Sequence, residues 1–109
     1  MRPNHTGYYT FYVYIMTNKY RTTYYIGMTN NLKRRLSEHL EAIRLKKNTF
    51  TGRYNLCDLI YYEKYGWVQQ AISREKELKG WRREKKIDLI KSQNETLQSY
   101  NDYVFSWGF

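Results

Sequence analysis

The chain has 109 residues, enough for one domain with a single modest core. Its 19 Lys and Arg against 10 Asp and Glu give a net charge of +9, which favours a polyanionic partner, nucleic acid before membrane, because the basic residues are spread along the chain. One cysteine excludes an intramolecular disulfide and argues against a cysteine-based zinc site. The sequence contains no apolar run near the roughly 18 residues that span a bilayer, and residues 1–7 lack a signal-peptide pattern. We therefore expect a reduced, cytoplasmic location.

Two strands and a long helix are predicted for the first half of the chain. Residues 9–17 are rich in β-branched and aromatic side chains, a polar turn follows at 18–21, and 22–28 has the composition of a returning strand, so the two should form a hairpin. A cap at 29–30 starts a helix that ends near Lys47. Its apolar side chains fall on one face and are Leu32, Leu36, Leu40 and Ile43.

The second half of the chain predicts one more strand and two more helices. A polar loop at 48–55 leads to a strand at 56–63, a helix that begins near Val68 and a very basic helix at 81–91. The final segment, 95–109, is too rich in aromatic residues for a free tail, so we expect it to pack back on the domain. The prediction is a single α+β domain over 1–109, with a core at about 9–94 and a small three-stranded antiparallel sheet flanked by helices.

Glu75 is a charged residue on the apolar face of the second helix, a face predicted to consist of Val68, Ala71, Ile72, Glu75 and Leu78. An unpaired carboxylate in such a place is costly. A salt bridge to Arg35, Arg74 or Lys76 would satisfy it. A divalent metal would also do so, because Mg²⁺ keeps several waters and needs only one or two protein carboxylates.

An aromatic and basic surface is predicted around the hairpin and the first helix. Tyr14 and Tyr25 stand on neighbouring strands, while Arg35 and His39 are four residues apart and share a helix face. Gly27 ends the second strand, where it can approach a ligand closely or take an unusual φ. Such a surface suits a phosphodiester, either as a nuclease site or as a binding face.

These motifs, in this order, resemble the GIY-YIG nuclease superfamily and specifically its small stand-alone bacterial branch. The first motif is Tyr12-Val13-Tyr14, with Tyr12 where the name-giving glycine would stand, and the second is intact as Tyr25-Ile26-Gly27. Residues 29–39 resemble the family's arginine helix, and residues 71–83 resemble its helix with Arg and Glu. The resemblance covers roughly residues 10–94 and implies a GIY-YIG endonuclease-like fold.

The resemblance also implies roles for five side chains. Tyr14 and Tyr25 resemble the motif tyrosines, one of which positions or deprotonates the attacking water. Arg35 resembles the arginine that holds the scissile phosphate, and His39 the helix residue that hydrogen-bonds a motif tyrosine or assists proton transfer. Glu75 resembles the single glutamate that binds the divalent metal, Mg²⁺ or Mn²⁺.

A phenol with a pKa near ~10 is a poor base at neutral pH unless cations lower that pKa. Arg34, Arg35 and a bound metal are the available cations. Met28 follows the second motif where some branches of the family carry a lysine. We therefore expect Lys33 or Arg34 to take over that lysine's effect on the tyrosine.

The leading hypothesis is a metal-dependent DNA endonuclease without a small-molecule cofactor. Single-stranded or structured DNA is favoured because surface tyrosines can stack on unpaired bases. The alternative is a non-catalytic nucleic-acid-binding module that retains the nuclease fold, and a weaker third option is a protein-interaction role for the aromatic C-terminal segment. The residues expected to contact nucleic acid are Gly27, Lys33, Arg34, Arg53, Tyr54, Arg82 and Arg83, and Asn94 is a further candidate through a loose match to a late asparagine of the family.

Overall fold

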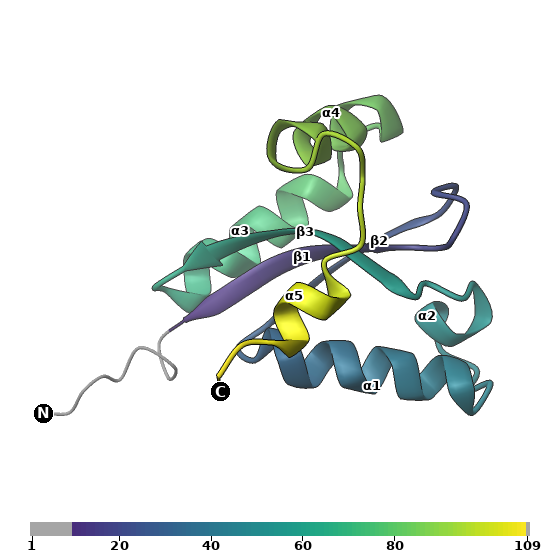
Figure 1. The fold of residues 1–109 in the computed structure, drawn as a ribbon. Coiled ribbons are helices and arrows are strands. Elements are labelled where there is room, and N and C mark those ends of the chain that lie inside the picture. The colour runs from purple at the N-terminus through teal and green to yellow at the C-terminus, as the bar shows by residue number, and fades with distance from the viewer. Residues whose placement is uncertain (1–9, 109) are drawn as a thin grey trace, which may run out of the picture.

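A three-stranded antiparallel sheet forms the centre of the computed structural model, which describes residues 10–108 (Figure 1). The strands are β1 (Phe11–Thr17), β2 (Tyr24–Thr29) and β3 (Asp58–Tyr65), in the order β2-β1-β3. Central β1 places Tyr14 opposite Gly27 of β2 and opposite Tyr62 of β3. The predicted α+β class with a three-stranded antiparallel sheet is confirmed.

Helices cover both faces of this sheet (Figure 1). One face carries α1 (Leu32–Arg44), the short α2 (Phe50–Arg53) and α5 (Asn101–Phe105). The opposite face carries α3 (Val68–Lys79) and α4 (Arg83–Gln93). Within the described part of the chain, none of these helices is long and apolar enough to cross a membrane.

Two apolar clusters fill the space between the sheet and its helices. Successive side chains of a strand point to opposite faces, so β1 contributes to both clusters. On the α1 and α5 side the cluster includes Tyr12, Tyr14, Met16, Leu32, Leu36, Leu59 and Val104. On the α3 and α4 side it includes Val13, Ile15, Ile26, Ile60, Ala71, Leu78 and Ile90.

Several element boundaries differ from those expected. Asn31 is the N-cap of α1, and its side-chain oxygen accepts a hydrogen bond from the Arg34 backbone N–H at 2.9 Å. The helix ends at Arg44, and the expected loop at 48–55 contains α2. Strand β3 and helix α4 each begin two residues later than predicted. Leu56 and Trp81, which suggested the earlier starts, pack on the core from outside these elements.

The predicted apolar face of α3 is wrong at two positions. Ala71 and Leu78 are fully buried, but Val68 and Ile72 are 37% and 41% exposed. The buried line of the helix therefore runs through Ala71 and Leu78, which are two turns apart. Glu75 lies beside this line and is only partly covered, so its carboxylate does not need a buried cation.

The segment after α4 contacts the sheet. The Tyr100 backbone N–H donates to the Leu59 carbonyl at 2.6 Å, the Asn101 amide donates to the Cys57 carbonyl at 2.8 Å, and Val104 is fully buried. The limits of the domain and of its core stay a prediction. The N-terminal stretch, with the expected strand start at Tyr9, lies outside the described residues.

Candidate active site

Tyr14 is held by a chain of buried polar groups. Its phenol oxygen lies 2.7 Å from Nε2 of His39, and Nδ1 of His39 lies 3.0 Å from the Thr51 hydroxyl. All three side chains are buried. Both hydroxyls can donate or accept, so either neutral tautomer of the imidazole completes the chain. Strand β1, helix α1 and helix α2 therefore meet through one histidine ring.

His39 is neutral at physiological pH. Burial lowers the pKa of its imidazole to about 4, and the positive charge of Arg35 adds to this effect. A neutral ring offers one nitrogen as an acceptor. His39 is therefore able to accept a hydrogen bond from the Tyr14 phenol, while its lowered pKa makes it a poor acceptor of the proton itself.

The lowered pKa of His39 predicts an acid-labile fold. An unfolded histidine titrates near 6.5 and the folded one at about 4, so the unfolded state binds more protons between these values and stability falls as the pH drops through that window. The slope from this residue is at most about 1.4 kcal/mol per pH unit. Urea unfolding of the parent and of His39→Gln should show their stability difference shrinking from pH 6.5 to 4. A pH-independent difference would contradict the assignment, since the carboxylates titrate alike in both proteins.

Arg35 lies one helical turn before His39 and faces the two motif tyrosines. Burial keeps the pKa of Tyr14 well above its usual value, and the neighbouring Tyr25 raises it further, while the Arg35 guanidinium acts in the lowering direction. The guanidinium also donates to Glu38 at 2.9 Å on the exposed side of α1. Arg35, one of the cations expected near the tyrosines, therefore acts on Tyr14, while the Lys33 ammonium is bound to the Trp107 carbonyl.

Tyr25 completes the cluster from β2. Its ring centroid lies 6.3 Å from that of Tyr14 and 5.6 Å from that of His39. The structure thus brings together Tyr14, Tyr25, Arg35 and His39, four of the five side chains expected to be catalytic.

Gly27 makes this packing possible. It stands opposite Tyr14 in the β1–β2 register, and a Cβ at this position would lie 2.5 Å from the Tyr14 phenol oxygen and 2.9 Å from a Tyr25 ring carbon. Its φ is not positive, so conformational freedom is not the reason for the glycine. The Tyr14 ring crosses the strand where glycine leaves room for it.

Gly27→Ala is expected to destabilise the fold by about 1–3 kcal/mol, the usual cost of overpacking a dense core. The added methyl meets the stiff Tyr14 and Tyr25 rings, so it should displace the phenol from His39. Chemical denaturation measures the stability, and the His39 ring signals in an NMR spectrum report the displaced phenol. Gly66→Ala is the matched control, because a Cβ there meets nothing within 4 Å. Equal stability of the two variants would contradict the close contact.

Glu75 approaches from α3, which packs against β2 and β1 on the other face of the sheet. Its negative charge acts on Tyr14, whose pKa it raises. Its carboxylate lies 3.3 Å from the Lys79 ammonium, so none of the expected partners Arg35, Arg74 and Lys76 pairs with it. Lys79 is 55% exposed and can release the carboxylate.

The single carboxylate of Glu75 fits a weakly bound divalent cation that keeps most of its water ligands. Among residues 10–108, no three His, Cys, Asp or Glu side chains come together as a protein-only metal site. One carboxylate, released from the exposed Lys79, is compatible with Mg²⁺ or Mn²⁺, since Mg²⁺ keeps several of its waters when it binds. Glu75 is the residue that would hold such an ion.

The residues expected to contact nucleic acid are spread over three parts of the molecule. The Lys33 ammonium donates to the Trp107 carbonyl at 2.8 Å, which ties α1 to the C-terminal segment. Arg34 is exposed and contacts Asn30 and Glu38. The remaining basic residues lie near aromatic rings or acidic groups: Arg53 over Tyr54, Arg83 over Tyr24, and Arg82 beside Glu84.

Asn94 has a structural role. Its side-chain N–H groups donate to the carbonyls of Ile60 and Gln98 at 2.9 and 2.7 Å, and its oxygen accepts from the Gln98 backbone N–H. It is buried where α4 ends, and it connects that end to β3. The amide is fully used by the backbone, so the geometry does not support a role in the site.

Two residues of the site were missed in the sequence. Thr51 holds His39, and the Phe50 ring lies 5.8 Å from the Tyr25 ring. Both belong to α2, which was expected to be loop. The N-cap Thr49, whose hydroxyl accepts from the Gly52 backbone N–H, is the signal that could have indicated a helical turn.

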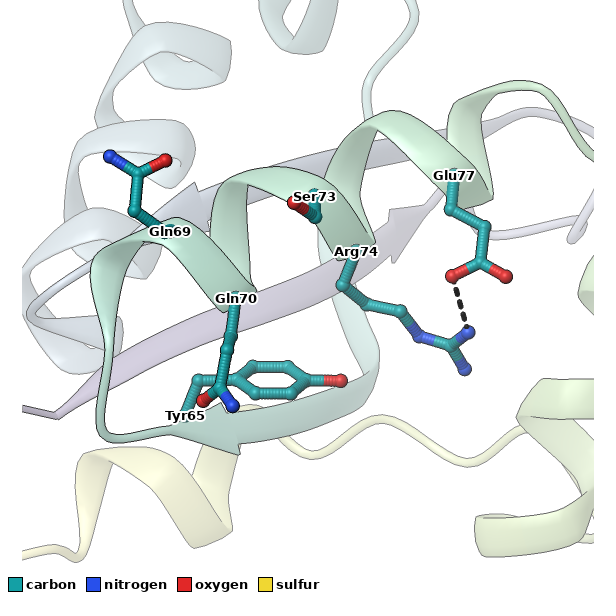
Figure 2. Close-up of a pocket in the computed structure, with 6 residues that line it drawn as sticks. All are labelled: Tyr65, Gln69, Gln70, Ser73, Arg74 and Glu77. Atoms are coloured by element: carbon teal, nitrogen blue, oxygen red, sulfur yellow. Dashed lines mark hydrogen bonds and ion pairs between the residues drawn. The ribbon is translucent and has the colours of Figure 1, made fainter.

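A shallow hollow along α3 lies outside this cluster (Figure 2). It is lined by Tyr65, Gln69, Gln70, Ser73, Arg74 and Glu77. Its cation is already paired, because Arg74 donates to Glu63 at 2.9 Å and to Glu77 at 3.0 Å. Tyr65 also donates to Glu63, at 2.6 Å, which leaves the hollow without a free charged group aimed into it.

A three-stranded sheet that sets two motif tyrosines beside a basic helix is the architecture of a nuclease-type domain. The chain belongs to the GIY-YIG family, since the family model described as the GIY-YIG catalytic domain matches residues 10–88. It is also similar to the UPF0213 protein CPE1444 of Clostridium perfringens (strain 13 / Type A), with 33% identity over 93 residues that cover 85% of this chain and 96% of the relative. No solved structure matches the chain at a significant level. The family resemblance expected from the motifs is confirmed.

Proposed function

We propose that this protein is a metal-dependent endonuclease that hydrolyses phosphodiester bonds in DNA, with single-stranded or structured DNA as its preferred substrate. The observation that carries the proposal is the Tyr14 phenol held between neutral His39 and the guanidinium of Arg35. A protein that only binds nucleic acid has no need for a buried phenol that shares a hydrogen bond with a buried imidazole beside a guanidinium. The expected cytoplasmic location remains a prediction.

In the proposed reaction, Tyr14 donates a hydrogen bond to Nε2 of His39, and its oxygen accepts a hydrogen bond from the attacking water and positions it. The proton of the water passes to a phosphoryl oxygen as the new P–O bond forms. This positioning role suits a phenol whose pKa is raised by burial, because the phenol keeps its proton throughout. Arg35 holds the scissile phosphate and stabilises the negative charge that develops on it.

Glu75 is the residue proposed to hold a divalent cation, Mg²⁺ or Mn²⁺. When bound, such an ion acts as a Lewis acid that stabilises charge on phosphoryl and leaving oxygens. The Glu75 carboxylate is partly exposed, and its charge already acts on Tyr14, so a cation held there would lie near the phenol. A single carboxylate would suffice, because the remaining ligands of the ion would be water and phosphate oxygens.

The charge and the surface of the domain support DNA as the substrate. The net charge of +9 suits a phosphate backbone, and exposed arginines such as Arg53 and Arg82 are accessible to it, the latter only loosely paired with Glu84 at 3.8 Å. Reading a duplex requires an element that enters the major groove. Helix α2, whose Phe50 ring lies beside the Tyr25 ring, has only four residues, which favours contact with unpaired strands.

A cleavage panel tests this proposal. Purified protein with Mg²⁺ or Mn²⁺ should cut labelled single-stranded or branched DNA, EDTA should stop the reaction, and Tyr14→Phe should be inactive although it keeps the ring. Duplex DNA and RNA of the same sequence complete the panel. Salt-sensitive binding without cleavage under any metal would instead identify a binding module, with log K falling by roughly 0.7–0.9 per phosphate contact as log salt rises.

A further inference from the structure

Two aromatic rings, one from α2 and one from its C-cap residue, are partly exposed next to the tyrosine cluster. Phe50 and Tyr54 are 43% and 47% exposed, although large aromatic side chains gain most from burial. Their ring centroids lie 4.8 Å apart, and the guanidinium carbon of Arg53 lies 5.5 Å from the Tyr54 ring. We call Phe50, Arg53 and Tyr54 the α2 platform.

The α2 platform continues the candidate active site. The Phe50 ring lies 5.8 Å from the Tyr25 ring, and the Tyr25 ring lies 5.6 Å from His39. Thr51, in the same helical turn, holds the other side of His39. A strand bound at Tyr25 and Arg35, the partly exposed members of the cluster, would therefore meet Phe50 at a neighbouring nucleotide.

The backbone of α2 is fixed, so the rings are presented in a set orientation. The Thr49 hydroxyl caps the turn, and the Leu56 backbone N–H donates to the Thr51 carbonyl at 3.1 Å. Gly52 is buried, and a Cβ there would collide with the Lys47 carbonyl oxygen, so glycine lets α2 pack against the end of α1. Exposed rings on a fixed turn lose little entropy when they bind a flat partner.

The surrounding charge selects the partner. Between Glu41 and Asp58 the chain contains no acidic residue, while its basic residues are Arg44, Lys46, Lys47 and Arg53. An aromatic pair among cations is the arrangement by which proteins bind single strands, with rings stacked on bases and cations on phosphates. Both faces of a base in a continuous duplex are covered by neighbouring bases, so the α2 platform suits an unpaired base.

We propose that the α2 platform binds unpaired bases next to the scissile phosphate, with Phe50 and Tyr54, whose ring planes are inclined at 45° to each other, each stacked on a separate base and Arg53 on the adjoining phosphate. The position relative to the cleaved bond rests on the proposed function. The stacking of bases on these rings is independent of the proposed function. Through this stacking, Phe50 and Tyr54 set the preference for single-stranded over duplex DNA.

The test measures binding in EDTA, without cleavage. Fluorescence anisotropy with labelled oligo-dT should show roughly 5- to 150-fold weaker binding for Phe50→Ala, the loss expected for one stacked base. Phe50→Leu should lose nearly as much, because it keeps apolar volume but no ring, and Phe50→Tyr should bind as the parent does. Trp67→Ala is the matched control, because Trp67 is 72% exposed at the turn before α3, at the other end of the sheet.

A spectroscopic readout separates stacking from altered folding. A single 2-aminopurine in the oligo-dT should lose fluorescence on binding to the parent and much less on binding to Phe50→Ala, while circular dichroism stays unchanged. Unaltered affinity and quenching in Phe50→Ala and Tyr54→Ala would overturn the inference, even if the protein cuts DNA. Ring-dependent binding by a protein that cuts nothing would support the α2 platform and refute only the nuclease proposal.

Discussion

Arg35→Ala is expected to lower the rate of DNA cleavage by about 10²–10³-fold, the loss seen when one preorganised donor to a developing oxyanion is removed. The Arg35 guanidinium is the cation that faces the Tyr14 phenol, and it also interacts electrostatically with the Tyr25 phenol. DNA affinity should change little, because one phosphate contact is lost among many on a chain with a net charge of +9. Single-turnover cleavage and anisotropy together separate the two effects.

Arg34→Ala is the matched control for this prediction. Arg34 is the neighbouring residue, 59% exposed, and its guanidinium contacts Asn30 and Glu38 rather than a tyrosine. Its loss should leave the cleavage rate within a few fold of the parent. Arg35→Lys should restore little activity, because an ammonium lacks the planar fork that holds a phosphate at two points. Equal losses from Arg34→Ala and Arg35→Ala would reduce Arg35 to a general contributor of charge.

The hairpin was predictable from sequence because its local and long-range preferences agree. Residues 11–17 and 24–29 combine β-branched and aromatic side chains with a polar turn, and the pairing of neighbouring strands follows. The cluster of two tyrosines, Arg35 and His39 follows from that pairing, which brings Tyr14 next to Tyr25, together with the helical spacing of Arg35 and His39. The order of the motifs thus predicted which side chains lie together, and the structure adds Thr51 and Phe50, which contact His39 and Tyr25.

The α2 turn was hidden because a four-residue helix leaves almost no periodic signal in a sequence. Its polar composition indicates a loop, and its contribution to the site depends on packing against α1, which only the tertiary structure reveals. Thr51 and Phe50 were missed for this reason. The error at Val68 and Ile72 has a related cause, since the sheet covers only a narrow line of α3.

Lys33 and Asn94 show the limits of assigning function by residue type. Lys33 has the charge expected of a phosphate contact, but its ammonium is bound to the Trp107 carbonyl. Asn94 occupies the position expected of a late family asparagine, and its amide is used entirely by the backbone around it. The observed contacts of Lys33 and Asn94 are both made with the C-terminal segment, and no local sequence pattern predicts where that segment packs.

Glu75→Gln is expected to reduce cleavage by at least about 10²-fold, because a catalytic metal ion supplies several kcal/mol of stabilisation. The fold should survive, since the pair with Lys79 is partly exposed and surface ion pairs contribute about 0–1 kcal/mol. Glu77→Gln is the control from the same helix, where Glu77 pairs with Arg74 on the side of the hollow (Figure 2). Its cleavage rate and its Mg²⁺ dependence should match those of the parent.

The direction of the Glu75→Gln effect distinguishes metal binding from a purely electrostatic role. The Glu75 charge raises the pKa of Tyr14, so removing that charge alone makes the phenol easier to deprotonate. A rate that stays constant or rises in Glu75→Gln would therefore mean that Glu75 acts only on Tyr14 and holds no ion. A rate that falls, with a higher Mg²⁺ or Mn²⁺ concentration needed for half-maximal cleavage, would mean that the carboxylate binds the metal, because its loss then outweighs the gain in phenol acidity.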